Sequence, residues 1–169
     1  MNDQQLLLGE WACLGILYQG PSHGFAVARR LRPDGDVGRV WSLSRPLTYR
    51  ALDQLVRREL VCAVGEEPGI AGGNRTVLAA TRRGRARLRM WVARPVAHLR
   101  DVRSELLLKL VLAEQCGLDV RPMIAAQQAR IAELNAALAA PPTADADVVA
   151  LWRYEASEAA RRFVDRLRP

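Results

Sequence analysis

A chain of 169 residues has room for one domain, or for a small domain with an accessory one. Half of its residues are apolar, which excludes global disorder, and no apolar run is long enough to span a bilayer. The N-terminus lacks the basic start and cleavage site of a signal peptide, so a cytoplasmic location is expected.

The formal net charge of +7 is distributed unevenly along the chain. Residues 1–93 hold 14 basic and 8 acidic side chains, whereas residues 94–169 hold 11 and 10. A polyanionic partner would therefore meet the N-terminal part. Arginine richness alone says little about function, because all basic residues but Lys109 are arginine and alanine is common, a composition typical of a GC-rich genome.

Three cysteines, Cys13, Cys62 and Cys116, are odd in number and lie far apart in the sequence. Their spacing matches neither a disulfide framework nor a set of metal ligands, so reduced core thiols are expected. No metal and no cofactor is expected.

The first elements are helical. Apolar residues predict a helix over 5–18 with a broad buried face. Ser22 is placed to cap a short second helix over 23–31, in which Phe25 is expected to pack. Residues 32–38 form a loop by composition.

A third helix is predicted over 44–60, opening at Ser44 and carrying an apolar stripe at Leu52, Leu55 and Val56. It is also rich in arginine, which gives its remaining surface a positive charge.

Two strands follow at 61–64 and 76–80, on either side of a glycine-rich interruption. Thr81 is then placed to cap a helix over 82–93. A basic helix beside a basic two-stranded tip is the arrangement with which a winged helix-turn-helix holds DNA. The sequence therefore predicts a mainly α fold with a small β-wing in residues 1–93.

The remaining residues predict three further helices, over 96–116, from Asp119 onward and over 146–167. A linker at 139–145 separates the last two. Apolar residues in the middle helix recur every seven positions, at Ile124, Ile131 and Leu138. Such spacing predicts helices that pack on each other or on a second chain. The alternative is a monomer whose extra helices fold back on their own core. A homodimer is favoured, because a single DNA-binding unit that contacts only half of an operator would bind weakly.

With these segments in place, the chain resembles the PadR family of bacterial transcriptional regulators. The resemblance covers nearly the whole chain and rests on LGILYQGPSHGFAVARRL (14–31), LSRPLTYRALDQLVRRELV (43–61), TRRGRARL (81–88) and HLRDVRSELLLKLVLAEQ (98–115). It implies a winged-helix domain at 1–93 and a C-terminal helical dimerisation domain at 94–169. A homodimeric repressor of a palindromic operator in double-stranded DNA is the function it implies.

Candidate DNA contacts lie at the start of the third helix, where a recognition helix reaches base edges. Arg45 and Arg50 could pair with guanine, and Thr48 or Tyr49 could reach a phosphate. Arg57 lies later and fits a backbone contact. The alternative is a solvated basic face with Tyr49 half-buried in the domain.

Two further pairs are candidates for DNA contact. Asn74 and Arg75 follow two glycines at the hairpin tip, where they could enter the minor groove or touch phosphate; an ordinary loop is the alternative. Ser22 and His23 open the second helix, whose N–H groups suit a phosphate, although His23 also fits a capping residue.

Trp91 and Trp152 are candidates for lining an effector pocket. PadR-like regulators hold effectors near the dimer interface, and a flat apolar ligand would stack on an indole. The expected effector is a planar hydrophobic small molecule, and plain core packing of both tryptophans is the alternative.

Catalysis finds little support. The sequence lacks a nucleophile–base spacing, a phosphate-binding glycine loop and paired carboxylates on an apolar segment, so no enzyme is expected. A protein-interaction adaptor that keeps the winged helix without reading DNA remains the alternative function.

Overall fold

The computed structural model describes residues 5–69, 73–137 and 147–167. Its strands are β1 (Ser22–His23), β2 (Val61–Pro68) and β3 (Asn74–Ala80). Its helices are α1 (Leu8–Gln19), α2 (Gly24–Arg30), α3 (Arg45–Arg57), α4 (Arg82–Val92), α5 (Leu107–Cys116), α6 (Arg121–Ala137) and α7 (Val148–Arg166). A 3-10 turn, η1 (Leu99–Asp101), and a π turn, η2 (Val102–Leu106), precede α5.

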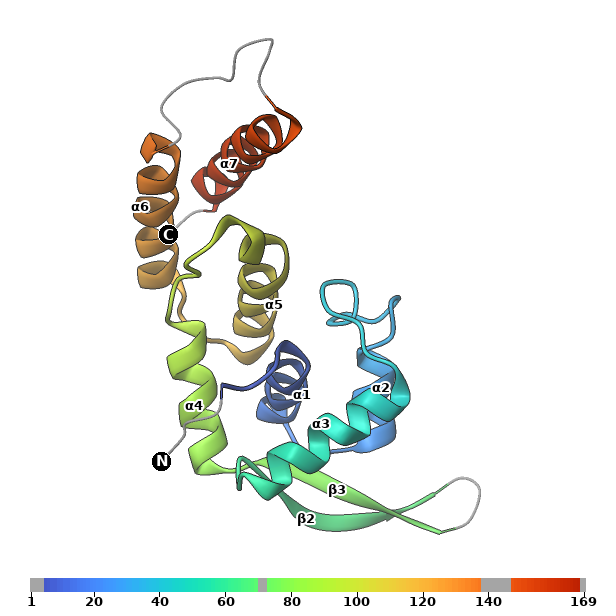
Figure 1. The fold of residues 1–169 in the computed structure, drawn as a ribbon. Coiled ribbons are helices and arrows are strands. Elements are labelled where there is room, and N and C mark those ends of the chain that lie inside the picture. Colours follow the sequence, from blue (N-terminus) through green and yellow to red (C-terminus); the bar gives the residue numbers. More distant parts are fainter. Residues whose placement is uncertain (1–4, 70–72, 138–146, 168–169) are drawn as a thin grey trace.

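The N-terminal part is a three-helix unit with a small antiparallel sheet in the order β1-β3-β2. Helix α1 lies in the middle of this unit (Figure 1) and is buried without interruption from Gly9 to Leu17. The β2–β3 hairpin runs below α3 and projects beyond it (Figure 1). This confirms the mainly α fold with a β-wing.

The helix ends follow local hydrogen bonds. Ser44 Oγ accepts from the N–H of Leu47 at 3.5 Å at the start of α3, and Thr81 Oγ1 accepts from that of Gly84 at 3.0 Å at the start of α4. Helix α5 ends at Gly117, whose φ of 63° is a left-handed conformation. These three ends confirm the predicted boundaries.

The second-helix cap was predicted wrongly. Ser22 lies in β1, opposite Leu78 of β3, and the capping group is His23, whose Nδ1 accepts from the N–H of Ala26 at 3.1 Å. A two-residue strand leaves no period in the sequence, so β1 was not predicted.

Two other expectations need correction. Strand β2 runs to Pro68 rather than to residue 64, and its side chains after Val61 are exposed, so apolar periodicity gave no signal for its far half. Because Cys62 lies on this exposed run, it is not a core thiol, whereas Cys13 is buried and Cys116 is half-buried.

The continuous helix expected over 96–116 is also wrong. Gln127 of α6 accepts from the N–H of Val96 at 2.7 Å and donates to its carbonyl at 3.3 Å. These bonds replace the helical partners of Val96, and His98 is extended, so the helix begins only after η1 and η2. Leu138 and the linker at 139–145 lie outside the described residues.

The apolar side chains form two cores. The first joins α1, α2, α3 and α4 with Leu108, Leu112 and Ala113 of α5. The second joins Leu106 of η2 to α6 and α7. Helix α5 thus packs on the winged unit while its N-terminal neighbour packs on the C-terminal helices. The boundary between residues 93 and 94 stays a prediction.

No helix within the described ranges is long and apolar enough to cross a membrane. In the same ranges, no group of three or more His, Cys, Asp and Glu side chains could hold a metal ion.

Candidate nucleic-acid interface

Helix α3 presents one face to the core and the other to solvent. Its buried positions recur three and four residues apart, at Thr48, Ala51, Leu52 and Leu55. Its exposed side chains are Arg45, Pro46, Leu47, Tyr49, Arg50, Asp53, Val56 and Arg57. All predicted contact residues of this helix except Thr48 therefore reach solvent.

Thr48 has a structural position. Its side chain is fully buried, and Oγ1 donates to the carbonyl of Ser44 at 3.0 Å. This bond supports the first turn of α3, so Thr48 positions its neighbours rather than facing a phosphate.

Tyr49 lies along the start of α2. A Cβ atom at Gly24 would come within 2.8 Å of Tyr49 Cε1, so a glycine is needed for the ring to approach this closely. The tyrosine is 39% exposed, which leaves part of the ring at the surface. The contact fixes α3 against α2 where α3 begins to face solvent.

Phe25 lies between two arginines from different elements. The guanidinium carbon of Arg45, in the first turn of α3, is 5.5 Å from the Phe25 ring centroid, and that of Arg75, in β3, is 5.3 Å away. Arg45 also lies 5.8 Å from the Tyr49 ring. Cation–π contacts orient guanidinium groups while leaving N–H donors free for another acceptor. We call Phe25, Arg45, Tyr49 and Arg75 the arginine–aromatic cluster.

The outer face of α3 keeps its positive charge. In the part of the chain that the structure describes, no ion pair involves Arg45, Arg50 or Arg57. Arg58 differs, because its guanidinium lies 3.5 Å from the carboxylate of Glu10. Asp53 is the acidic side chain on the same face. The net charge of this face is therefore positive and open to an anion.

The hairpin is less basic than the sequence suggested. Asn74 donates from Nδ2 to Glu66 Oε2 at 2.7 Å, which commits its amide within the hairpin. Arg75 stands opposite Glu67 in the strand register, and Glu67 Oε2 lies 4.0 Å from His23 Nε2. The wing thus presents one arginine beside two carboxylates, and α3 carries more of the positive charge.

The start of α2 offers little to a phosphate. The Nδ1 atom of His23 already satisfies the N–H of Ala26, and Ser22 is paired in β1. The helix has only seven residues, so its dipole is short.

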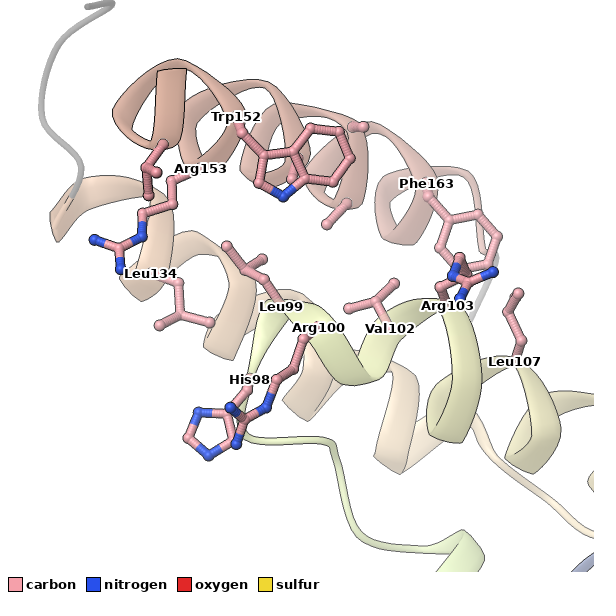
Figure 2. Close-up of a pocket in the computed structure, with 14 residues that line it drawn as sticks. His98, Leu99, Arg100, Val102, Arg103, Leu107, Leu134, Trp152, Arg153 and Phe163 are labelled. Carbon is pink, nitrogen blue, oxygen red and sulfur yellow. The ribbon is translucent and has the colours of Figure 1, made fainter. Parts of the chain in front are cut away.

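The two candidate effector tryptophans lie in different places. Trp91 stacks on Trp11, with centroids 4.6 Å apart and planes at 8°, and the Lys109 Nζ lies 5.0 Å from the Trp91 centroid. Trp152 is 70% exposed and lines a pocket among the C-terminal helices (Figure 2). Trp91 does not line that pocket, so the structure does not bring the two together.

Phe25 is the functional candidate that the sequence did not reveal. An aromatic residue in the first turn of a short helix normally packs in the core, yet Phe25 is 43% exposed. The signal was its place directly after Gly24, because that glycine brings α3 close enough for Arg45 to reach the ring.

No protein-family model matches the chain, and no curated protein matches it. A crystal structure of PadR from Bacillus subtilis in complex with operator DNA is similar at 16% sequence identity and a TM-score of 0.49, over 92% of this chain and 95% of that chain. Another crystal structure of Bacillus subtilis PadR gives 16% identity and a TM-score of 0.45, over 98% and 95%. Similarity this distant does not assign a function, so the functional case rests on the chain's own geometry.

Proposed function

We propose that this chain is a sequence-specific DNA-binding transcriptional regulator that works in the cytoplasm as a homodimeric repressor and is released by a small-molecule effector. The observation that carries the proposal is the arginine–aromatic cluster, which joins the start of α3 to the wing through Phe25. A recognition helix reads bases with its N-terminal residues, and Arg45 occupies that place.

The chemistry of the cluster suits DNA. An arginine held on an aromatic ring has lost part of its side-chain freedom before binding, so less entropy is lost when it pairs with a base or a phosphate. Arg50 and Arg57 extend the positive face along α3 and suit phosphates farther along the groove. Arg75 of β3 would touch the flanking backbone.

The homodimer is supported by α7. Its first two turns expose Val148 and Leu151, and neither side chain lines the pocket of Figure 2. Large apolar side chains exposed side by side are typical of a protein interface. A second copy packed there would supply the second half-site reader.

The first test is selection of bound sequences from a randomised DNA duplex library, followed by fluorescence anisotropy of the selected duplex and a scrambled one. We expect the selected duplex to bind more tightly, with a steep salt dependence. For a protein that makes roughly six to ten phosphate contacts, the affinity falls by roughly 10³–10⁵-fold as the salt concentration rises from about 50 to 200 mM.

Arg45→Ala and Arg166→Ala make a matched pair, because both remove an exposed arginine but only Arg45 lies in the cluster. We expect Arg45→Ala to cost about 1–3 kcal/mol and to relax preference at one base position. Arg166→Ala should bind like the parent. A uniform loss across sequences would make Arg45 a phosphate contact.

Equal and weak binding to selected and scrambled duplexes would contradict the proposal. The protein-interaction adaptor would then become the better explanation of the same fold.

A further inference from the structure

A pocket lies among the C-terminal helices, away from the proposed DNA interface (Figure 2). The cavity has a volume of about 980 Å³ and is lined from one side by η1 and η2 and from the other by α7. A volume of this size is at the upper end of the range for small-molecule sites. The arginine–aromatic cluster lies on other elements, so the pocket is separate from the proposed DNA interface.

The lining divides into an apolar interior and a cationic rim. Aliphatic side chains dominate the interior, with Leu99, Val102 and Leu134 facing Trp152 and Phe163 of α7. The charged part of the rim consists of Arg100, Arg103 and Arg153, and the imidazole of His98 also lines the pocket. No lining residue is acidic.

Two of the rim charges are available, whereas the Arg100 guanidinium lies 3.9 Å from the Asp101 carboxylate. Within the described residues, no ion pair involves Arg103 or Arg153, and the Glu105 carboxylate is already bound by Lys109 Nζ at 2.7 Å. Figure 2 places Arg153 near Trp152 and Arg103 near Phe163, at opposite ends of the cavity. An anionic group could therefore meet an unpaired guanidinium at either end.

The pocket is long. Trp152 and Phe163 are eleven residues apart on α7, which corresponds to roughly 16 Å of helix. A compact ring system would leave much of such a cavity empty, whereas an extended chain would contact both ends.

We propose that this pocket binds an aliphatic carboxylate of medium to long chain length, with its chain between Trp152 and Phe163 and its carboxylate on Arg103 or Arg153. The chain would cover the exposed Trp152 indole and remove apolar surface from water. Binding itself is independent of the DNA-reading proposal, whereas a role as the releasing signal rests on it.

The probe is dodecanoate, used below its micelle concentration and titrated into the full chain by calorimetry and by tryptophan fluorescence. Dodecanol has the same chain without the charge, and dodecyltrimethylammonium carries the opposite charge. We expect saturable one-site binding of dodecanoate, weaker binding of dodecanol by about tenfold or more, and no saturable binding of the cation.

The variant Arg103→Gln/Arg153→Gln should weaken dodecanoate by about tenfold to a hundredfold and leave dodecanol unchanged. Arg166→Gln, an exposed arginine on α7 outside the lining, is the matched control and should bind like the parent. Ala156→Phe, which adds a ring inside the cavity, should abolish binding of both, with circular dichroism confirming that the variant is folded.

Three results would overturn the proposal. Equal binding of all three amphiphiles would reveal nonspecific adsorption. If the double glutamine variant binds dodecanoate as tightly as the parent, Arg103 and Arg153 do not hold the carboxylate. Absence of dodecanoate binding, together with Trp152 emission that shifts to the blue as the protein dimerises, would show that a second copy fills the pocket. Since DNA is absent from these titrations, failure of operator binding would leave their outcome unchanged.

Discussion

Glu59 holds a backbone conformation that normally belongs to glycine. Its φ is 57°, and it follows α3, where the N–H of Leu60 bonds the carbonyl of Leu55 at 3.0 Å and the N–H of Glu59 bonds that of Val56 at 2.9 Å. These are the two bonds of a Schellman ending, in which glycine is preferred at this position. The glutamate therefore carries steric strain at the junction between α3 and the wing.

Glu59→Gly should stabilise the protein by about 0.5–1 kcal/mol, because the relief of strain exceeds the added freedom of the unfolded chain. The lost ion pair with Arg83, at 3.5 Å and well exposed, contributes little. Thermal unfolding should show a rise in Tm of about 1–4 °C. Glu59→Ala removes the carboxylate but keeps the strain, so an equal rise in that variant would refute the explanation.

For single residues, the sequence predicted best those whose role depends on hydrogen bonds to their neighbours in the chain. Ser44 and Thr81 were identified correctly as caps. The same reasoning failed at Ser22, which lies in β1, so that His23 caps α2. Thr48 and Phe25 were misjudged in opposite directions, one buried and one exposed. Their burial depends on how α2 and α3 cross, which is set by contacts such as that between Gly24 and Tyr49 and not by neighbours in the chain.

Among the elements, a polar network ties the winged unit to α5. Arg30 of α2 bonds Asp36 at 2.6 Å, and both bond Gln115 of α5, at 2.9 and 3.1 Å. The hydrogen bonds from Arg30 hold the pKa of Asp36 below its ordinary value. The network therefore connects the loop after α2 with the helix that leads to the C-terminal core.

Asp36→Asn should lower the stability at pH 7 by up to about 1 kcal/mol, since the side chain is half-exposed and its ion pair partly screened. Because the pKa of Asp36 is lowered in the folded state, its contribution is complete above the unfolded value of about 3.9 and is lost as the pH falls through the folded value. Urea unfolding between about pH 3 and 7 should show the two proteins converging at the acid end.

Asp34→Asn is the matched control on the same loop. Asp34 pairs with Arg32 at 3.4 Å with both side chains largely exposed, so its loss should be close to neutral at every pH. A gap between Asp36→Asn and the parent that persists unchanged at the lowest pH would mean that packing, and not charge, underlies the effect.

Elements with a strong apolar period were predicted well, as for α3 and α4, and α1 was predicted from its nearly continuous apolar residues. The segment before α5 was not, because a side chain 31 residues away, Gln127, takes the backbone bonds of Val96. Strand β1 was missed because its partner, β3, lies more than fifty residues later. Periodicity reports only the face that an element buries, so bonds made by distant residues leave no trace in it.

For the whole molecule, the proposed homodimer can be tested on α7. Leu151→Glu places a charge on the exposed apolar surface and should weaken dimerisation by about tenfold or more, as read by sedimentation velocity over a concentration series. Ala150→Glu adds the same charge to an exposed neighbour that points about 100° away around the helix. If the dimer is equally stable in both variants, the interface lies elsewhere. If the parent is monomeric at all concentrations, the proposed homodimer is wrong.

Helix α5 also bears on how such a chain could be recombined in evolution. The Leu112 side chain packs so closely on Gly15 that a Cβ atom there would lie 2.6 Å from it, and Leu108 and Ala113 complete the same core. A gene fragment ending after α4 would encode the winged unit with the apolar surface of α1 that faces α5 left uncovered. The winged unit that could be joined to a different C-terminal part therefore extends through Gly117, and recombination is expected at the turn between α5 and α6.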